Sequence, residues 1–213
     1  MDELDARLTF VTETWLSDGQ SLDEDKQDLF LGAGLSMLCK NRPKNSNSNT
    51  SYGGVAIFYR EDVCNFKEIT FPNQDNYEVL TAVGTMVGHV RKVVAVACYI
   101  PPNYNSSRGN GALDYIGGLV IEIKRKYRDP YIIISGDFNQ WDLATALEEY
   151  RDLKEESVGP TRGKHTIDRT FTNLGSVTSV GTLDPLHTED NRRHSDHAVC
   201  FIKAVIPLSL IHI

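Results

Sequence analysis

Apolar residues recur along the chain at two different spacings, and together these predict a protein made of strands and helices. Continuous or alternating apolar runs predict strands at residues 8–12, 55–59, 78–86, 92–100, 131–134, 169–173 and 198–204. The run at 131–134 is apolar at every position, which is typical of a strand buried on both faces. In residues 112–127 the apolar positions follow a helical spacing, and a shorter helix is predicted at 143–150.

Polar segments separate these elements. Residues 41–51 and 103–111 are predicted loops, and Pro101-Pro102 ends the strand that precedes the second of them. The chain contains no internal repeat and no linker long enough to divide it. The order of elements therefore predicts an α+β protein with two packed sheets, in one domain over residues 1–205. Residues 206–213 form an apolar tail that we assign to no element.

Charge is distributed unevenly along the 213 residues. The formal net charge of −7 argues against a protein that binds nucleic acid through bulk charge. Residues 1–30 hold nine acids and two bases, however, so residues 31–213 carry 20 of each sign. The net charge is thus a weak argument against nucleic acid, and it predicts a modest affinity for it.

Targeting signals and cysteine clusters are not found in the sequence. The N-terminus lacks the basic and apolar regions of a signal peptide, and the most apolar stretch, residues 198–213, is interrupted by polar residues and proline. The four cysteines are far apart and form no Cys-x-x-Cys pair, which disfavours a zinc site or a disulfide framework. We therefore predict an intracellular protein, nuclear or cytoplasmic, that is neither secreted nor bound to a membrane.

Polar residues gather where the predicted strands begin or end. They are Glu13, Tyr99, Asp137, Asn139, Asp168, Asp196 and His197. In a sheet with antiparallel neighbours, opposite ends of different strands can lie on the same rim. Carboxylates brought so close together destabilise one another unless a cation lies among them. Hard oxygen ligands of this kind suit Mg²⁺ or Mn²⁺ better than zinc.

Each polar segment alone also has a purely structural interpretation. The segment from Gly136 to Asn139 fits an Asx turn at the end of a strand, and Glu13 alone fits an exposed surface residue. Ser195-Asp196-His197 fits a loop or a cap, and Tyr99 fits a core residue with a satisfied hydroxyl. The functional interpretation gains its weight from the segments taken together and in order.

Five segments in this order resemble the endonuclease/exonuclease/phosphatase superfamily. They are Thr12-Glu13-Thr14-Trp15-Leu16, Gly53-Gly54-Val55-Ala56-Ile57-Phe58, Tyr99-Ile100-Pro101-Pro102-Asn103, Ile134-Ser135-Gly136-Asp137-Phe138-Asn139 and Ser195-Asp196-His197. The closest resemblance is to the apurinic-endonuclease-like endonuclease domain of non-LTR retrotransposons. It is carried by the sequence of residues 12–16, by the double proline and by residues 160–163. This resemblance implies a four-layered α/β sandwich of two packed mixed β-sheets flanked by helices. The family begins with a strand that carries an asparagine, and we expect this first strand to be missing here.

The resemblance also implies a divalent metal ion, Mg²⁺ or Mn²⁺, and residues that act with it. Glu13 resembles the principal metal ligand, and Asp196 resembles a carboxylate near the metal. Asp137 resembles the base that activates the attacking water, with Asn139 orienting water or phosphate beside it.

The remaining implied roles concern the substrate phosphate. His197 resembles the histidine that contacts the scissile phosphate, and Asp168 resembles the residue that holds it. Tyr99 and Asn103 resemble phosphate contacts, and Arg162 is a candidate for substrate binding. Further basic loop residues that are candidates for phosphate contacts are Arg42, Lys44, Arg108, Lys164, Arg192 and Arg193.

The function implied is a metal-dependent phosphodiesterase, a DNA endonuclease that nicks target DNA for a retroelement. A reverse transcriptase domain is expected in the parent element and is absent from this sequence. Two alternatives remain: a catalytically inactive remnant of the domain, or an enzyme of the same fold that hydrolyses lipid or inositol phosphates.

Overall fold

The computed structural model describes residues 8–14, 34–41, 53–156, 158–175, 177–183, 197 and 199–204. Its strands are β1 (Leu8–Thr12), β2 (Leu35–Lys40), β3 (Val55–Arg60), β4 (Lys67–Glu68), β5 (Glu78–Thr85), β6 (Lys92–Tyr99), β7 (Tyr131–Asp137), β8 (Lys154–Glu156), β9 (Asp168–Thr172), β10 (Val177–Leu183) and β11 (Val199–Ala204). Its helices are the 3-10 turn η1 (Gln74–Asn76), α2 (Ser106–Lys126) and α3 (Leu143–Ala146).

The largest sheet has six strands in the order β4-β5-β6-β7-β9-β8. Strands β6 and β7 are parallel and every other neighbouring pair is antiparallel. Parallel neighbours need a long crossover, and α2 lies in this connection. The remaining described strands form an antiparallel sheet in the order β1-β3-β2 and the antiparallel pair β10-β11.

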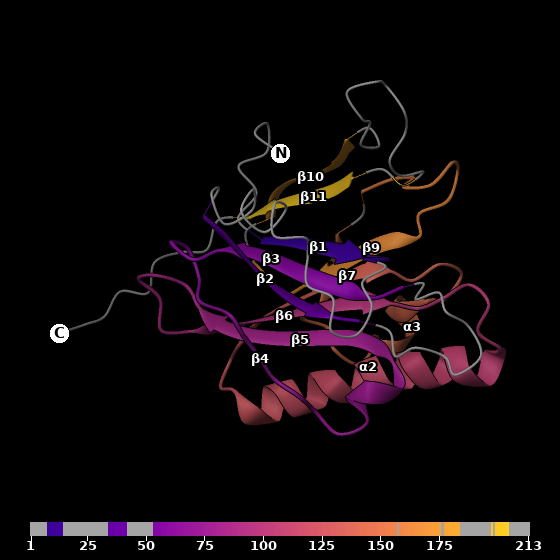
Figure 1. The fold of residues 1–213 in the computed structure, drawn as a ribbon, viewed down its shortest axis with the longest axis horizontal. Coiled ribbons are helices and arrows are strands. Elements are labelled where there is room, and N and C mark those ends of the chain that lie inside the picture. The colour runs from indigo at the N-terminus through magenta and orange to yellow at the C-terminus, as the bar shows by residue number, and fades with distance from the viewer. Residues whose placement is uncertain are drawn as a thin grey trace.

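Two apolar cores fill the spaces on either side of the six-stranded sheet. Its helix-facing side packs Val96 and Ile134 against Ile116 and other residues of α2. Its opposite side packs Ala97 and neighbouring side chains against Ile57 of the three-stranded sheet. Figure 1 shows α2 along one side of the six-stranded sheet and the strands β1, β3 and β2 along the other. The predicted α+β sandwich is thereby confirmed.

Several element boundaries differ from the prediction. Residues 103–111 were expected to form a loop and the helix to begin at residue 112. Helix α2 instead begins at Ser106. The side chain of Asn105 accepts a hydrogen bond of 2.9 Å from the Arg108 N–H, and this cap starts the helix before the apolar spacing becomes visible. Helix α3 is shorter than residues 143–150, because its hydrogen bonds close at Leu147. In the described part of the chain, no helix is long and apolar enough to cross a membrane.

Candidate active site

Three of the predicted site residues lie side by side in the six-stranded sheet. Tyr99 at the end of β6 is the register partner of Asp137 at the end of β7, and Asp137 is the partner of Asp168 at the start of β9. Register partners on neighbouring strands point to the same face of a sheet. We call Tyr99, Asp137 and Asp168 the acidic row. It lies on the face that packs against the three-stranded sheet, where Tyr99 belongs to the core.

Asp137 is buried, and a backbone N–H holds its carboxylate. Its side chain is only 3% exposed, and its Oδ1 accepts a 2.8 Å hydrogen bond from the Asn139 N–H. Asn139 has a left-handed φ of 48°, and its side-chain amide donates to the Ile100 carbonyl at 3.1 Å. The Asx turn considered above is therefore present, and it serves to fix the carboxylate of Asp137.

The environment of Asp137 disfavours its ionised form and so raises its pKa. Its pKa is raised from 3.8 to about 6, chiefly by burial. The nearby carboxylates of Asp168 and Glu13 also raise this pKa, while the Asn139 N–H and His197 lower it. A bound cation would favour the ionised carboxylate.

His197 reaches the acidic row from the start of β11. Its Nδ1 lies 2.9 Å from Oδ2 of Asp168, and both side chains are about one-fifth exposed, at 21% and 19%. A carboxylate at Nδ1 selects the tautomer or charge state with a proton there and leaves Nε2 for another partner. One ligand atom each of Asp137, Asp168 and His197 can be chosen so that all lie within 4.8 Å of one another.

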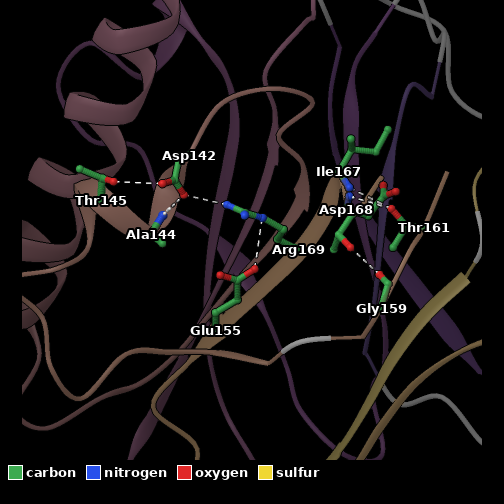
Figure 2. A network of polar contacts seen from close by, with 10 residues as sticks. Asp142, Ala144, Thr145, Glu155, Gly159, Thr161, Ile167, Asp168 and Arg169 are labelled. Carbon is green, nitrogen blue, oxygen red and sulfur yellow. Dashed lines mark hydrogen bonds and ion pairs between the residues drawn. The ribbon is translucent and has the colours of Figure 1, made fainter. Parts of the chain in front are cut away.

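Two hydrogen bonds anchor the backbone at Asp168 and the residue before it, as Figure 2 shows. The hydroxyl of Thr161 accepts hydrogen bonds from the N–H groups of Ile167 and Asp168, each at 3.1 Å. The next residue, Arg169, points to the opposite face and pairs with Asp142 at 2.9 Å and Glu155 at 3.1 Å. These side chains carry no signal in the sequence, because their contacts come from other segments of the chain.

Glu13 approaches the row from the three-stranded sheet. It follows β1 directly, and β1 packs across β6 and β7. Its φ of 55° is left-handed, and the hydroxyl of Tyr99 donates a hydrogen bond to its carboxylate. Glu13 thus lies close enough to raise the pKa of Asp137 by its charge.

In the described part of the chain, the structure does not join the other predicted site residues to the acidic row. Asn103 is exposed, and within the described residues the structure gives it no hydrogen bond to the acidic row or to His197. Arg162 is exposed in a tight turn closed by its backbone contacts with His165. Asp196 lies outside the described residues, as do the basic candidates Arg42, Lys44, Arg192 and Arg193.

The site fits a hard divalent cation. Glu13 offers an oxygen ligand beside the carboxylates of Asp137 and Asp168 and the imidazole of His197, which lie within one small space. Mutual repulsion of the carboxylates is the reason that a cation would stabilise this arrangement. The site combines a buried carboxylate, an oriented histidine and further oxygen ligands, and such a set of groups can activate water and bind a phosphate.

Comparison with solved structures agrees with this fold. The structure of the human Nocturnin catalytic domain with bound sulfate aligns with a TM-score of 0.61 and 16% identity over 93% of this chain and 81% of that one. A mannosyl-6-phosphatase of Bacteroides thetaiotaomicron aligns with a TM-score of 0.65 and 14% identity over 96% and 87%. D. rerio TDP2 complexed with a single strand DNA product aligns with a TM-score of 0.59 and 16% identity over 93% and 86%. At such identities the likeness shows a shared fold.

A sequence search of curated proteins finds no match. The profile of one family does match, over residues 3–197, which is most of the chain. This stretch includes the acidic row, Glu13 and His197. The chain belongs to the Endonuclease/Exonuclease/phosphatase family.

Proposed function

We propose that this protein is a divalent-metal-dependent phosphodiesterase that nicks DNA. The observation that carries the proposal is the convergence of Asp137, Asp168 and His197, whose ligand atoms lie within 4.8 Å of one another. Glu13, hydrogen-bonded to Tyr99, brings a further carboxylate to the same rim. Membership of the family supports hydrolysis of a phosphate ester as the reaction class, and these side chains supply the groups it needs.

In the proposed mechanism, Asp137 in its ionised form accepts a proton from the water that attacks phosphorus. Asn139 holds that carboxylate in place through its N–H. His197, oriented at Nδ1 by Asp168, donates a hydrogen bond from Nε2 to a phosphate oxygen. A bound Mg²⁺ or Mn²⁺ supplies positive charge that stabilises the phosphate oxygens and the leaving oxygen. Glu13 is its proposed principal ligand, with Asp196 as a further one.

The basic turn at residues 162–165 supports DNA as the substrate. Arg162, Lys164 and His165 are all exposed there, and the turn is joined to Asp168 through the hydroxyl of the adjacent Thr161. Exposed basic side chains next to a phosphodiesterase site suit a polyanion that extends beyond the scissile phosphate. The sequences of residues 12–16 and 160–163 support the retroelement branch. DNA as the substrate is also supported by D. rerio TDP2, which has the same fold and was solved with a single strand DNA product.

Nicking of supercoiled plasmid in Mg²⁺ by the purified protein tests the proposal. We expect Asp137→Asn to slow nicking by on the order of 1000-fold, because general-base catalysis contributes about that much. Asp129→Asn is the matched control, since it makes the same change at an exposed residue near the opposite end of β7. A folded protein that binds metal but nicks no better than Asp137→Asn would favour the inactive remnant.

The salt dependence of binding separates DNA from a small phosphate ester. If the basic turn contacts DNA phosphates, affinity falls steeply as salt increases, and neutralising Arg162 and Lys164 reduces that slope by about two. A flat salt response, together with turnover of an inositol or lipid phosphate, would favour the phosphatase alternative.

A further inference from the structure

Glu78 is a buried acid that has no role in the mechanism above. It is the first residue of β5, and it is only 6% exposed. Its register partner is Tyr99, so it extends the acidic row to a fourth neighbouring strand. A buried carboxylate costs free energy unless hydrogen bonds compensate its lost hydration, and its position beside the site therefore calls for an explanation.

One contact of Glu78 leads directly toward the proposed metal ligand. Its Oε2 accepts a 2.7 Å hydrogen bond from the N–H of Gly54, just before β3. The Gly54 carbonyl accepts a 3.3 Å bond from the N–H of Thr14, the residue after Glu13. The hydroxyl of Tyr99 donates a hydrogen bond to Glu13, and Tyr99 is the register partner of Glu78. The chain of contacts that starts at Glu78 therefore leads back to Glu78. We call Glu78, Gly54, Thr14, Glu13 and Tyr99 the contact ring.

The backbone of the ring is in conformations that need external support. Gly53 and Gly54 have φ values of 100° and 90°, which favour glycine. A Cβ on Gly54 would lie 2.4 Å from the Thr14 hydroxyl, so the two segments approach as closely as glycine allows. Glu13 has a φ of 55°, an unusual conformation for a non-glycine residue that persists only when its surroundings enforce it.

We propose that Glu78 is a positioning residue, which fixes Gly54 and thereby holds the Glu13 carboxylate in its metal-binding position. This inference rests on the proposed function in that Glu13 is taken as the metal ligand. A hydrogen bond from a backbone N–H to a carboxylate is stronger than one between neutral groups, which suits a support for strained backbone. Residues that orient metal ligands in this way affect metal binding although they do not touch the metal.

Calorimetric titration with Mn²⁺ tests the inference without depending on catalysis. We expect Glu78→Ala to weaken Mn²⁺ binding by on the order of 10-fold, as loss of an orienting residue does elsewhere. Glu78→Gln should retain more affinity, because its amide oxygen can still accept the Gly54 N–H. Glu68→Gln is the matched control, since Glu68 is an exposed acid on β4 in the same sheet.

The same titration in a Glu13→Gln background distinguishes positioning from a general structural effect. If Glu78 acts through Glu13, adding Glu78→Ala to Glu13→Gln should change Mn²⁺ affinity by less than about 2-fold. An equal loss in both backgrounds, or an unchanged affinity in Glu78→Ala, would overturn the inference. If Glu78→Ala does not fold, Glu78→Leu, which also lacks an acceptor for the Gly54 N–H, replaces it in both backgrounds with the same criterion.

Plasmid nicking by the same variants separates the two proposals. Mn²⁺ binding that follows these expectations in a protein that does not nick would overturn the proposed function and support the role of Glu78. Normal nicking and normal Mn²⁺ binding in Glu78→Ala would support the function and overturn the role. A wild-type protein that binds no Mn²⁺ would overturn both.

Discussion

The acidic row and the two residues that approach it are held in place in different ways. Asp137 and Asp168 are adjacent because β7 and β9 are hydrogen-bonded in that register, so the ladder of the sheet sets their separation. Glu13 and His197 come from outside the six-stranded sheet, and each is attached to the row by a side-chain hydrogen bond. The spacing of the acids thus depends on backbone pairing, while the completeness of the site depends on a few side-chain contacts.

Among the contacts that hold the site together, the largest effect should come from breaking a side-chain attachment. We expect His197→Ala and Asp168→Asn each to slow nicking by on the order of 100-fold, because the first removes the imidazole and the second removes the carboxylate that orients it. The double variant should be no slower than the worse single one, since residues that act as a unit are not additive. Single-turnover nicking rates measure this, with Asp129→Asn as control. Losses that multiply would contradict the view that Asp168 acts through His197.

A smaller effect is expected from loosening the backbone of the row. Thr161→Val removes the acceptor of two N–H groups, those of Ile167 and Asp168, and should lower the free energy of unfolding by about 1–3 kcal/mol. Thr161 is buried, whereas Thr178 is exposed and donates to one carbonyl, so Thr178→Val should cost less than about 0.5 kcal/mol. Urea unfolding compares the two. Equal losses would show that the Thr161 contacts do not hold the row.

The smallest effect concerns the charge within the row. The pKa of Asp137 is raised to about 6 in the folded protein, against an ordinary value of 3.8. Between these values the folded state keeps a proton that the unfolded state has released, so stability of the metal-free protein falls as pH rises from about 4 to about 6 and stays lower above. Asp137→Asn removes this loss and should stabilise the metal-free protein at about pH 7 by on the order of 1 kcal/mol.

Urea unfolding in the presence of a chelator measures that difference at about pH 4 and about pH 7. Asp129→Asn is again the control, because Asp129 lies exposed in a salt bridge with Arg91 away from the row. A gain for Asp137→Asn that is the same at both pH values would contradict the sign derived above.

The central strands were predictable because their sequences leave few alternatives. Strand β6 after Lys92 and the first four residues of β7 are apolar at every position, as burial on both faces requires. The edge strand β8, with the sequence Lys-Glu-Glu, was missed because nothing in it favours a strand until β9 offers a partner. Strand β10, rich in Thr, Ser and Gly, was missed for a similar reason, since its pairing with β11 spans a long sequence separation.

The candidate site was predictable in part for the same reason. Polar residues directly after an apolar strand, such as Asp137, are local signals that can be read along the chain. Thr161 gives no such signal, because it acts through backbone N–H groups of another element. Glu78 begins a predicted strand, but its contact with the distant Gly54 N–H cannot be read from the sequence. Asn103 follows a strand in the expected way, yet the described contacts do not join it to the row.

The sequence alone determined which segments form the core strands and which polar residues stand at their ends, because both follow from the local order of apolar and polar side chains. Only the tertiary structure decided the register that places Tyr99, Asp137 and Asp168 on one face. A shift of one residue would turn each side chain to the opposite face. The raised pKa of Asp137 likewise depends on burial and on neighbouring charges, which arise when distant segments pack together.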